Sequence, residues 1–377
     1  MIVRSLRRVS GDVFLLLAVV LPYLLLYAFW TVVYTIFMTR KTILLVFGGE
    51  SSEHDVSISS ARNIYAALDG EKYDTLLGYI DRRGKWWLLD EWSDEPAHHG
   101  RAQLLCAPGT GSLMVVPGNT VIHPDVVLPV LHGKNGEDGT IQGLLALSHI
   151  PFVGCDMTAG AVCMDKILTK QVLEANGIKT VDFIVYRKGE KVPAYRDIAE
   201  ALGTVMFVKP SRAGSSVGVT KVHDESEFTP AIEAALAHDD RVLIERAVAG
   251  REIETAVLGV PPYHQVTQAV GEIIPGSEFY DYDDKYSADS KSQVITDVKI
   301  DQNLKESIRD ISARAYAVLG CRGLSRIDYL VEGDTPYVIE VNTFPGFTNI
   351  SMYPKLWRAD GLHYPDLIDR LINDALK

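Results

Sequence analysis

The sequence predicts a mixed α/β protein that opens, after an apolar N-terminal extension, with an open α/β unit. Apolar residues make up 47% and charged residues 23% of the 377 residues, as in folded globular proteins. Residues 41–47 form a short apolar run ending at two glycines, the pattern of a buried parallel strand that enters a tight turn. A helix follows, from a cap at Ser51 or Ser52 to about Leu68. Strand, glycine turn and helix in this order predict a ligand near the carboxyl end of the strand.

The remaining elements follow from the same patterns. We expect further strands at 126–131, 150–153, 205–208 and 241–245, and helices at 165–176, 306–319 and 364–376. Gly177 and Gly320 directly follow two of these helices and can end them. Residues 275–297 are polar and rich in tyrosine, and loops of this length are usually functional or disordered.

Charge and cysteine content exclude some classes of function. The net charge is -12 and the isoelectric point about 5.3, which argues against a nucleic-acid partner. The four cysteines form no CxxC pair, so they indicate neither a disulfide framework nor a zinc site. Reduced cysteines packed in a cytosolic fold are the expected arrangement.

Residues 13–38 carry no charge and are long enough to span a bilayer at 1.5 Å per residue. Three interpretations stay open: a membrane anchor, an interfacial helix, or a stretch upstream of the true start of translation near Met38. Arg4, Arg7 and Arg8 precede the segment, whereas Arg40 and Lys41 follow it, a distribution that would weakly place the N-terminus in the cytoplasm and the main body outside. None of the three bears on the chemistry of the rest of the chain.

The strongest local feature is the segment SRIDYLVEGDTPYVIEVN, two alternating strands around a turn at residues 333–335. With the turn centred on Asp334, Asp328 faces Glu340 and Arg326 faces Asn342, all on one face of the sheet. Two adjacent carboxylates repel each other unless a cation lies between them. Oxygen ligands without cysteine or histidine favour Mg²⁺. The alternative is an exposed hairpin whose charges face water.

Three glycine-rich segments add candidate binding loops. KPSRAGSSVG (209–218) follows a strand and offers backbone N–H groups and a lysine to phosphate, although a flexible turn would look the same. HGKNGEDGTIQG (132–143) allows close backbone approach to a small ligand. In GGESSEHDVS, Glu53 lies in the first turn of a helix, where it either interacts with the helix dipole or holds a substrate ammonium.

These segments, in this order, resemble those of D-alanine–D-alanine ligases, members of the ATP-grasp superfamily. The motifs are GGESSEHDVSISSARN, HGKNGEDGTIQGLL, MDKILTK, VKPSRAGSSVGV, FYDYDDKY, RIDYLV and EVNTFPGFTNISMYP, and the resemblance covers about residues 41–377. It implies an ATP-grasp fold preceded by an open α/β domain. We expect the extension at 1–40, an N-terminal domain at 41–155, a central domain at 156–244 and a C-terminal domain at 245–377, with a lid at about 275–297.

The resemblance also implies roles for individual residues. ATP contacts would be Lys166, Lys209, Ser216, Glu245, Val248, Glu252 and Lys285, and metal ligands Asp328, Glu340 and Asn342 for Mg²⁺ or Mn²⁺, two ions in all. Catalytic residues would be Glu53, Ser215, Tyr286 and Arg326, and substrate contacts His132, Gly346 and Ser351. Glu53, Ser215 and Tyr286 would link the first substrate site to the lid, and Arg326 would stabilise the tetrahedral oxyanion.

The activity implied is the joining of two D-alanines at the expense of ATP, through a D-alanyl phosphate, for peptidoglycan synthesis. Tyr286 and the apolar Met352 argue against the related ligases that take D-lactate or D-serine second. Two further alternatives are another ATP-grasp enzyme and a non-catalytic, membrane-anchored nucleotide-binding relic. The resemblance implies a homodimer in the cytoplasm. The apolar segment at 13–38, which departs from the pattern of this family, leaves an inner-membrane anchor open as the alternative.

Overall fold

The computed structural model describes residues 40–93, 95–96, 100–118, 120–276, 292–296, 298–348 and 350–377. The apolar extension, Tyr286 and Lys285 therefore lie outside the described residues. No helix within these ranges is long and apolar enough to cross a membrane. The described chain forms a small unit, residues 40–41 and 69–74, and a large unit that holds the rest. An ion pair of 2.6 Å between Arg40 and Asp74 lies within the small unit.

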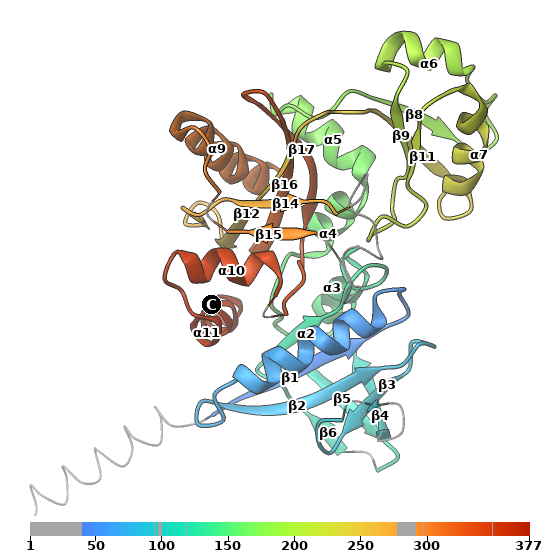
Figure 1. Ribbon diagram of the computed structural model, residues 1–377. Coiled ribbons are helices and arrows are strands. Elements are labelled where there is room, and N and C mark those ends of the chain that lie inside the picture. Colours follow the sequence, from blue (N-terminus) through green and yellow to red (C-terminus); the bar gives the residue numbers. More distant parts are fainter. Residues whose placement is uncertain are drawn as a thin grey trace, which may run out of the picture. The chain divides into compact units, whose positions relative to one another are not determined.

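The first sheet has the strand order β6-β5-β4-β3-β2-β1-β7. Its strands are β1 (Lys41–Gly48), β2 (Tyr73–Ile80), β3 (Trp86–Leu89), β4 (Gly100–Ala107), β5 (Ser112–Val116), β6 (Thr120–Ile122) and β7 (Val126–Val130). The predicted strands at 41–47 and 126–131 are confirmed, and they pair in parallel. Strands β2 to β6 form antiparallel pairs that the sequence analysis did not predict. Helices α2 (His54–Ala67) and α3 (Thr140–Leu147) complete this region (Figure 1).

Two predictions in this region are wrong. Residues 150–153 form no strand, because only Phe152 makes an isolated parallel bridge, to Val127. Neither Ser51 nor Ser52 is the N-cap of α2; Glu53 occupies that position without a side-chain cap bond. The Ser51 hydroxyl instead donates to the carbonyl of His132 at 2.7 Å, so it joins two loops rather than starting the helix.

The second sheet is antiparallel, in the order β10-β9-β11-β8. Its strands are β8 (Phe183–Arg187), β9 (Met206–Pro210), β10 (Thr220–Val222) and β11 (Arg241–Arg246), and the helices α6 (Tyr195–Leu202) and α7 (Glu225–Leu236) lie beside it (Figure 1). Side chains from both helices and from the strands form one apolar core. The predicted strands at 205–208 and 241–245 are confirmed as β9 and β11.

The third sheet has the order β15-β14-β12-β16-β17, with β13 paired to β12. Its strands are β12 (Arg251–Gly259), β13 (Gln265–Val266), β14 (Gly271–Ile274), β15 (Gln293–Ile295), β16 (Gly323–Glu332) and β17 (Thr335–Asn342). Strand β15 lies inside the stretch 275–297, which is therefore not all loop, contrary to our expectation. The accompanying helices are α4 (Met157–Met164), α5 (Lys166–Ala175), α9 (Gln302–Val318), α10 (Met352–Ala359) and α11 (Tyr364–Ala375).

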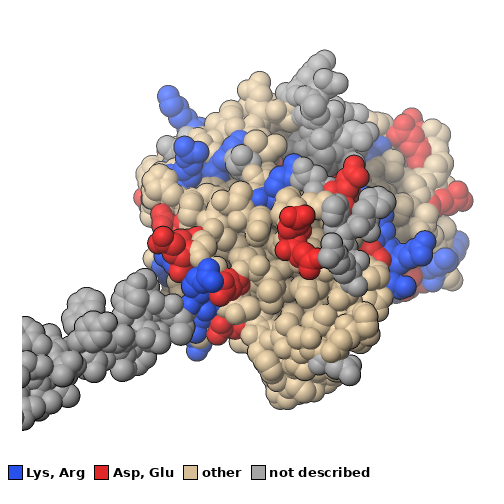
Figure 2. All heavy atoms as spheres, turned by 90° about the horizontal axis from the view of Figure 1, so that it is seen from below, with Lys and Arg blue, Asp and Glu red and all other residues tan. Residues whose placement is uncertain are grey.

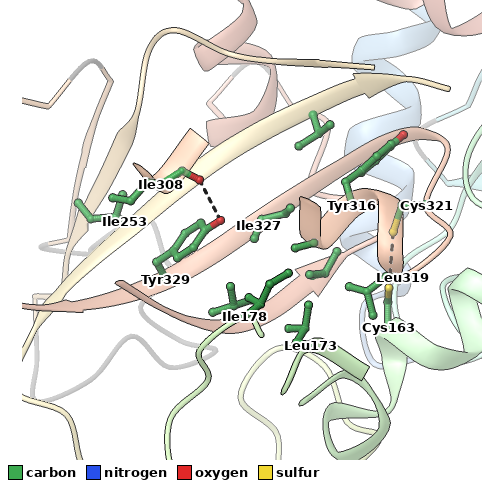
Figure 3. Close-up of a cluster of buried hydrophobic side chains, with 14 of the residues drawn as sticks. Cys163, Leu173, Ile178, Ile253, Ile308, Tyr316, Leu319, Cys321, Ile327 and Tyr329 are labelled. Atoms are coloured by element: carbon green, nitrogen blue, oxygen red, sulfur yellow. Dashed lines mark hydrogen bonds between the residues drawn. The ribbon is translucent and has the colours of Figure 1, made fainter. Parts of the chain in front are cut away.

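The predicted helices at 165–176, 306–319 and 364–376 are confirmed as α5, α9 and α11. Helix α9 begins four residues earlier than expected, because the Asp301 side chain accepts from the N–H groups of Asn303 and Leu304 and caps it. Helices α4, α5 and α9 pack on the third sheet through one apolar core (Figure 3). This core contains Tyr329, whose hydroxyl donates to the Ile308 carbonyl at 3.3 Å. The packing holds β16 and β17 in place, and these strands carry the predicted metal ligands.

The hairpin of β16 and β17 confirms part of the predicted register. Arg326 pairs with Asn342 and Asp328 pairs with Glu340, as expected. The predicted turn at residues 333–335 is wrong, because Glu332 pairs with Thr335 and the turn has two residues instead of three. The register shifts by one between Asp328 and Tyr329. A β-bulge absorbs the difference, so the pairs at the far end of the hairpin still fall as predicted.

Candidate active site

Two adjoining cavities contain every described residue that the sequence analysis assigned to a site. The first, about 700 Å³, is lined by Glu53, His132, Lys166, Ser215, Glu252, Arg326, Asp328, Glu340, Asn342, Gly346 and Ser351, among others. The second, about 420 Å³, is lined by Lys166, Lys209, Ser215, Ser216, Glu245, Val248, Glu252 and Glu340, among others. Of the polar residues, Lys166, Ser215, Glu252 and Glu340 line both. A ligand spanning the two cavities would therefore pass these four side chains.

The hairpin presents a charged cluster to the first cavity. Asp328 is only 2% exposed, and its two carboxylate oxygens accept from Nε and Nη2 of Arg326, both at 2.7 Å. The Asn342 amide donates to Asp328 at 2.9 Å, and Glu254 lies 3.2 Å from Nε of Arg326. Burial by itself would lower the pKa of Arg326, but Asp328 and Glu254 outweigh burial and raise it. The exposed-hairpin alternative is thus wrong.

Glu340 lies across from Asp328 on the same face of the sheet, 3.7 Å from the ammonium of Lys166. Two carboxylates and an amide, all on neighbouring positions at the wall of a cavity, are a donor set suited to a hard divalent cation. Lys166 also donates to the carbonyl of Ala213 at 2.8 Å, which directs its ammonium toward the loop before Ser215. These residues fit a metal ion and an anionic ligand held together.

The Glu53 carboxylate connects two loops that are distant in sequence. It accepts from the Ser215 hydroxyl at 2.5 Å. Ser215 has a φ of 49° and Ser216 a φ of 59°, so the loop turns through left-handed conformations that rarely suit serine. A Cβ added at Gly133 would lie 2.5 Å from Oε2 of Glu53, so only glycine allows this approach. The predicted contact between Glu53 and Ser215 is present, whereas Tyr286, its predicted third member, is outside the described residues.

His132 is nearly buried and fixed by two partners. Its Nε2 is 3.1 Å from the Ser60 hydroxyl, and its Nδ1 is 3.2 Å from the carbonyl of Phe344. Burial lowers the pKa of His132, which favours the neutral ring. In the neutral ring, Nδ1 donates to the Phe344 carbonyl and Nε2 accepts from the Ser60 hydroxyl, so both ring nitrogens are engaged and the ring is held at the cavity wall.

Glu245 and Lys209, which line the second cavity, form a buried ion triad with Lys170. Glu245 lies 2.6 Å from Nζ of Lys170 and 2.5 Å from Nζ of Lys209. Burial alone would raise the pKa of Glu245, but the two ammonium groups hold it down at about 2. The same contact raises the pKa of Lys209 against the opposing effect of burial. Glu245 therefore stays ionised and fixes the position of Lys209.

Gly346, Ser351 and Met352 line the end of the first cavity at the start of α10. A Cβ at Gly346 would lie 3.0 Å from Oγ of Ser351, so the chain passes the hydroxyl closely. The Ser351 hydroxyl accepts from the N–H of Thr348 at 3.1 Å. Met352 packs so tightly against Gly271 that a Cβ there would lie 2.4 Å from its sulfur. This end of the cavity combines a hydroxyl with an apolar wall.

Comparison with known proteins assigns the chain to a family. The D-ala D-ala ligase N-terminus model matches residues 42–155 and the D-ala D-ala ligase C-terminus model matches residues 172–373. A D-alanine–D-alanine ligase A from Salmonella typhimurium is 41% identical over an alignment of 359 residues, which covers 90% of this chain and 97% of the relative. The chain belongs to the D-alanine–D-alanine ligase family.

Two solved structures of relatives add to this result. The D-alanine–D-alanine ligase of Bacillus anthracis complexed with ATP is 30% identical, with a TM-score of 0.69, and covers 89% of this chain and 98% of that one. The VanG D-Ala:D-Ser ligase of Enterococcus faecalis is 33% identical, with a TM-score of 0.80, and covers 89% of this chain and 100% of that one. The likeness therefore includes a ligase with a different second substrate.

Within this ligase fold, two side chains of the site were not predicted from the sequence. Lys170 lies one helical turn after Lys166 inside the motif MDKILTK, so helical spacing could have placed it on the same side. Glu137 accepts from the N–H of Gly133 in its own loop at 2.7 Å and from the N–H of Phe344, after β17, at 3.4 Å. Burial, reinforced by Glu53, raises the pKa of Glu137 to about 8. The sequence offered no signal to separate it from the neighbouring Asp138.

Proposed function

We propose that this protein joins two D-alanines into D-alanyl-D-alanine, with ATP as the energy source, for peptidoglycan synthesis. The observation that supports this most is the pair of adjoining cavities. One contains the lysines and the buried carboxylate suited to a nucleotide, and the other contains the small-ligand residues. Glu340 and Lys166 lie where the two meet. A phosphoryl group passed from one cavity to a carboxylate in the other would travel past these two side chains.

In the first step, the carboxylate of the first D-alanine attacks the γ-phosphate of ATP and ADP leaves. Lys166 and Lys209 would hold phosphate oxygens and reduce the charge on the group in transit. Ser216, Val248 and Glu252 would contact the nucleotide. A divalent cation bound by Asp328, Glu340 and Asn342 would neutralise charge on the phosphates. Mg²⁺ suits these ligands, and Mn²⁺ would fit the same oxygens.

In the second step, the amine of the second D-alanine attacks the acyl carbon, phosphate leaves and the amine loses a proton. Glu53 would hold the ammonium of the first D-alanine, and the hydrogen bond of 2.5 Å from the Ser215 hydroxyl would fix its carboxylate. His132 would contact the same substrate from the opposite loop. Arg326 would stabilise the tetrahedral oxyanion. Tyr286 and Lys285, from the lid at about 275–297, would complete the site.

The choice of second substrate rests on the wall beside Ser351. Met352 is apolar and packed against Gly271, so it offers no partner to the hydroxyl of D-serine. D-alanine is therefore the proposed second substrate. We propose the same domain bounds as above, a homodimer, and a cytoplasmic site of action, where ATP is available.

The test uses the full-length chain with ATP, Mg²⁺ and D-alanine, with D-serine and D-lactate as competitors. Phosphate release and product mass are read together. D-alanyl-D-alanine as the main product supports the proposal, and Glu340→Ala should abolish turnover. The matched control, Glu233→Ala, removes an exposed carboxylate of α7 and should keep full activity. A product that contains D-serine or D-lactate would change the assignment of the second substrate. No phosphate release with any pair of substrates would overturn the proposal.

A further inference from the structure

One basic side chain of the first cavity has no role in the reaction described above. Lys355 lies on α10, four residues after Ser351, and lines the cavity together with Ser351 and Gly346. Residues four apart lie on the same face of a helix, so Lys355 and Ser351 are neighbours on the side that faces the cavity. The Lys355 side chain is partly buried.

The other two basic residues of this cavity are already engaged. Lys166 lies 3.7 Å from Glu340 and donates to the carbonyl of Ala213. Arg326 is shared between Asp328 and Glu254, so that cluster carries a net negative charge. Among the residues that the structure describes, none forms a hydrogen bond or ion pair with the ammonium of Lys355. Burial, with no carboxylate to oppose it, lowers the pKa of Lys355.

A partly desolvated ammonium without a counter-charge is costly, and an anionic ligand relieves that cost. The second D-alanine must direct its amine toward the acyl phosphate, which leaves its carboxylate free to point to the opposite side. The cavity wall at α10 is the side on which Ser351 and Lys355 lie. The carboxylate of the second D-alanine and the ammonium of Lys355 thus carry opposite charges, and each can serve as the partner of the other.

We propose that Lys355 binds the carboxylate of the second amino acid and makes the enzyme select a free acid over its amide. The inference rests on the proposed function. It concerns the carboxylate that all α-amino-acid acceptors share, so Lys355 selects the class of acceptor, whereas Met352 selects among side chains.

The experiment is a competition in one tube between D-alanine and D-alaninamide as acceptors, with the full-length chain, ATP and Mg²⁺. D-alaninamide has no carboxylate to be phosphorylated, so it acts only as an acceptor. The ratio of D-alanyl-D-alanine to D-alanyl-D-alaninamide, read by mass spectrometry, gives the ratio of the two kcat/KM values. This ratio does not depend on how much of the variant is active.

We expect Lys355→Met to lower the acid-to-amide ratio about tenfold, the lower end for a charge-assisted hydrogen bond because Lys355 is only partly buried. The KM for the second D-alanine should rise, while use of D-alaninamide stays the same. Lys355→Arg should keep most of the preference. The matched control is Arg358→Met, which removes a positive charge from the same helix at an exposed position and should leave the ratio unchanged.

A ratio in Lys355→Met equal to that of the unchanged protein overturns the inference while the proposed function stands. An equal fall in Arg358→Met also overturns it, because the effect would then be the general charge of the helix. If the unchanged protein forms no D-alanyl-D-alanine at all, the proposed function fails and this inference fails with it. Thermal unfolding of each variant separates a loss of binding from a loss of folded protein.

Discussion

Replacing Lys170 by methionine tests whether the buried ion triad stabilises the nucleotide cavity. The Lys170 side chain is 1% exposed and that of Glu245 is 5% exposed, and their charged atoms are 2.6 Å apart. The Lys170 ammonium also donates to the carbonyl of Val181 at 3.1 Å. Methionine keeps much of the length and packing of lysine but removes the charge and both contacts.

Removing one partner of a buried ion pair costs about 3–5 kcal/mol, because the other charge is left uncompensated. Here Lys209 still lies 2.5 Å from Glu245, so the loss in free energy of unfolding should be about 3 kcal/mol. For a cooperative unit of 150–250 residues, this lowers the midpoint of thermal unfolding by roughly 6–12 °C. The matched control is Lys188→Met, at an exposed position of the same region, where the expected change is within about 0.5 kcal/mol.

Acid provides a second readout. The pKa of Glu245 is held at about 2, below its usual 4.5, so its ionised form stabilises the folded state above pH 4.5. That stabilisation is lost as the pH falls from 4.5 toward 2. Lys170→Met removes one of the two cations that hold the pKa down, so its acid-induced loss of stability should be smaller. A midpoint within 1–2 °C of the unchanged protein at neutral pH, roughly the shift of half a kcal/mol, would refute the reasoning.

Three further changes test other contacts by thermal unfolding. Asp165→Ala removes the N-cap of α5 and the buried partner of Arg241, and should cost about 3 kcal/mol, whereas Asp165→Asn should cost less because it keeps the cap. Gly271→Ala places a Cβ against the sulfur of Met352 and should cost about 1–3 kcal/mol, and Met352→Ala in the same chain should restore part of it. Glu137 has a pKa raised to about 8, so its contribution to stability is full below pH 4.5 and is lost as the pH rises toward 8; Glu137→Gln should flatten this dependence.

The sequence predicted those elements whose pattern is local. Strand β1, its glycine turn and helix α2 follow from consecutive residues, and so do the capped helix α5 and the hairpin of β16 and β17. The antiparallel strands β2 to β6 were missed, because some have only three or four residues and their pairing partners are defined by the fold. The short apolar run at 150–153 was predicted as a strand, because the sequence pattern alone does not show whether a neighbouring strand is available for pairing.

The same limit holds in the site. The pairing of Asp328 with Glu340 could be predicted, because a short turn joins their strands. The sequence could not show that Arg326 contacts Glu254 on β12 as well as Asp328. Nor could it show that Ser51 bonds to the loop at His132, a contact that spans eighty-one positions. In both cases a polar side chain forms a hydrogen bond or ion pair with a residue that is distant in the sequence and that only the fold brings close. Burial then makes such partners necessary, because an unpaired polar group inside the protein is costly.

The bulge in β17 shows how the hairpin serves both cavities. In a regular strand, consecutive residues point to opposite faces, so Ile339 and Glu340 could not both face a ligand. Yet both line the second cavity. The register shift between Asp328 and Tyr329 supplies the extra residue that makes this possible. Without it, the two-residue turn would place Ile339 opposite Asp328 and direct Glu340 toward the core. The bulge thus gives the nucleotide cavity an apolar contact at Ile339 and keeps Glu340 opposite Asp328, where a cation can bind both carboxylates.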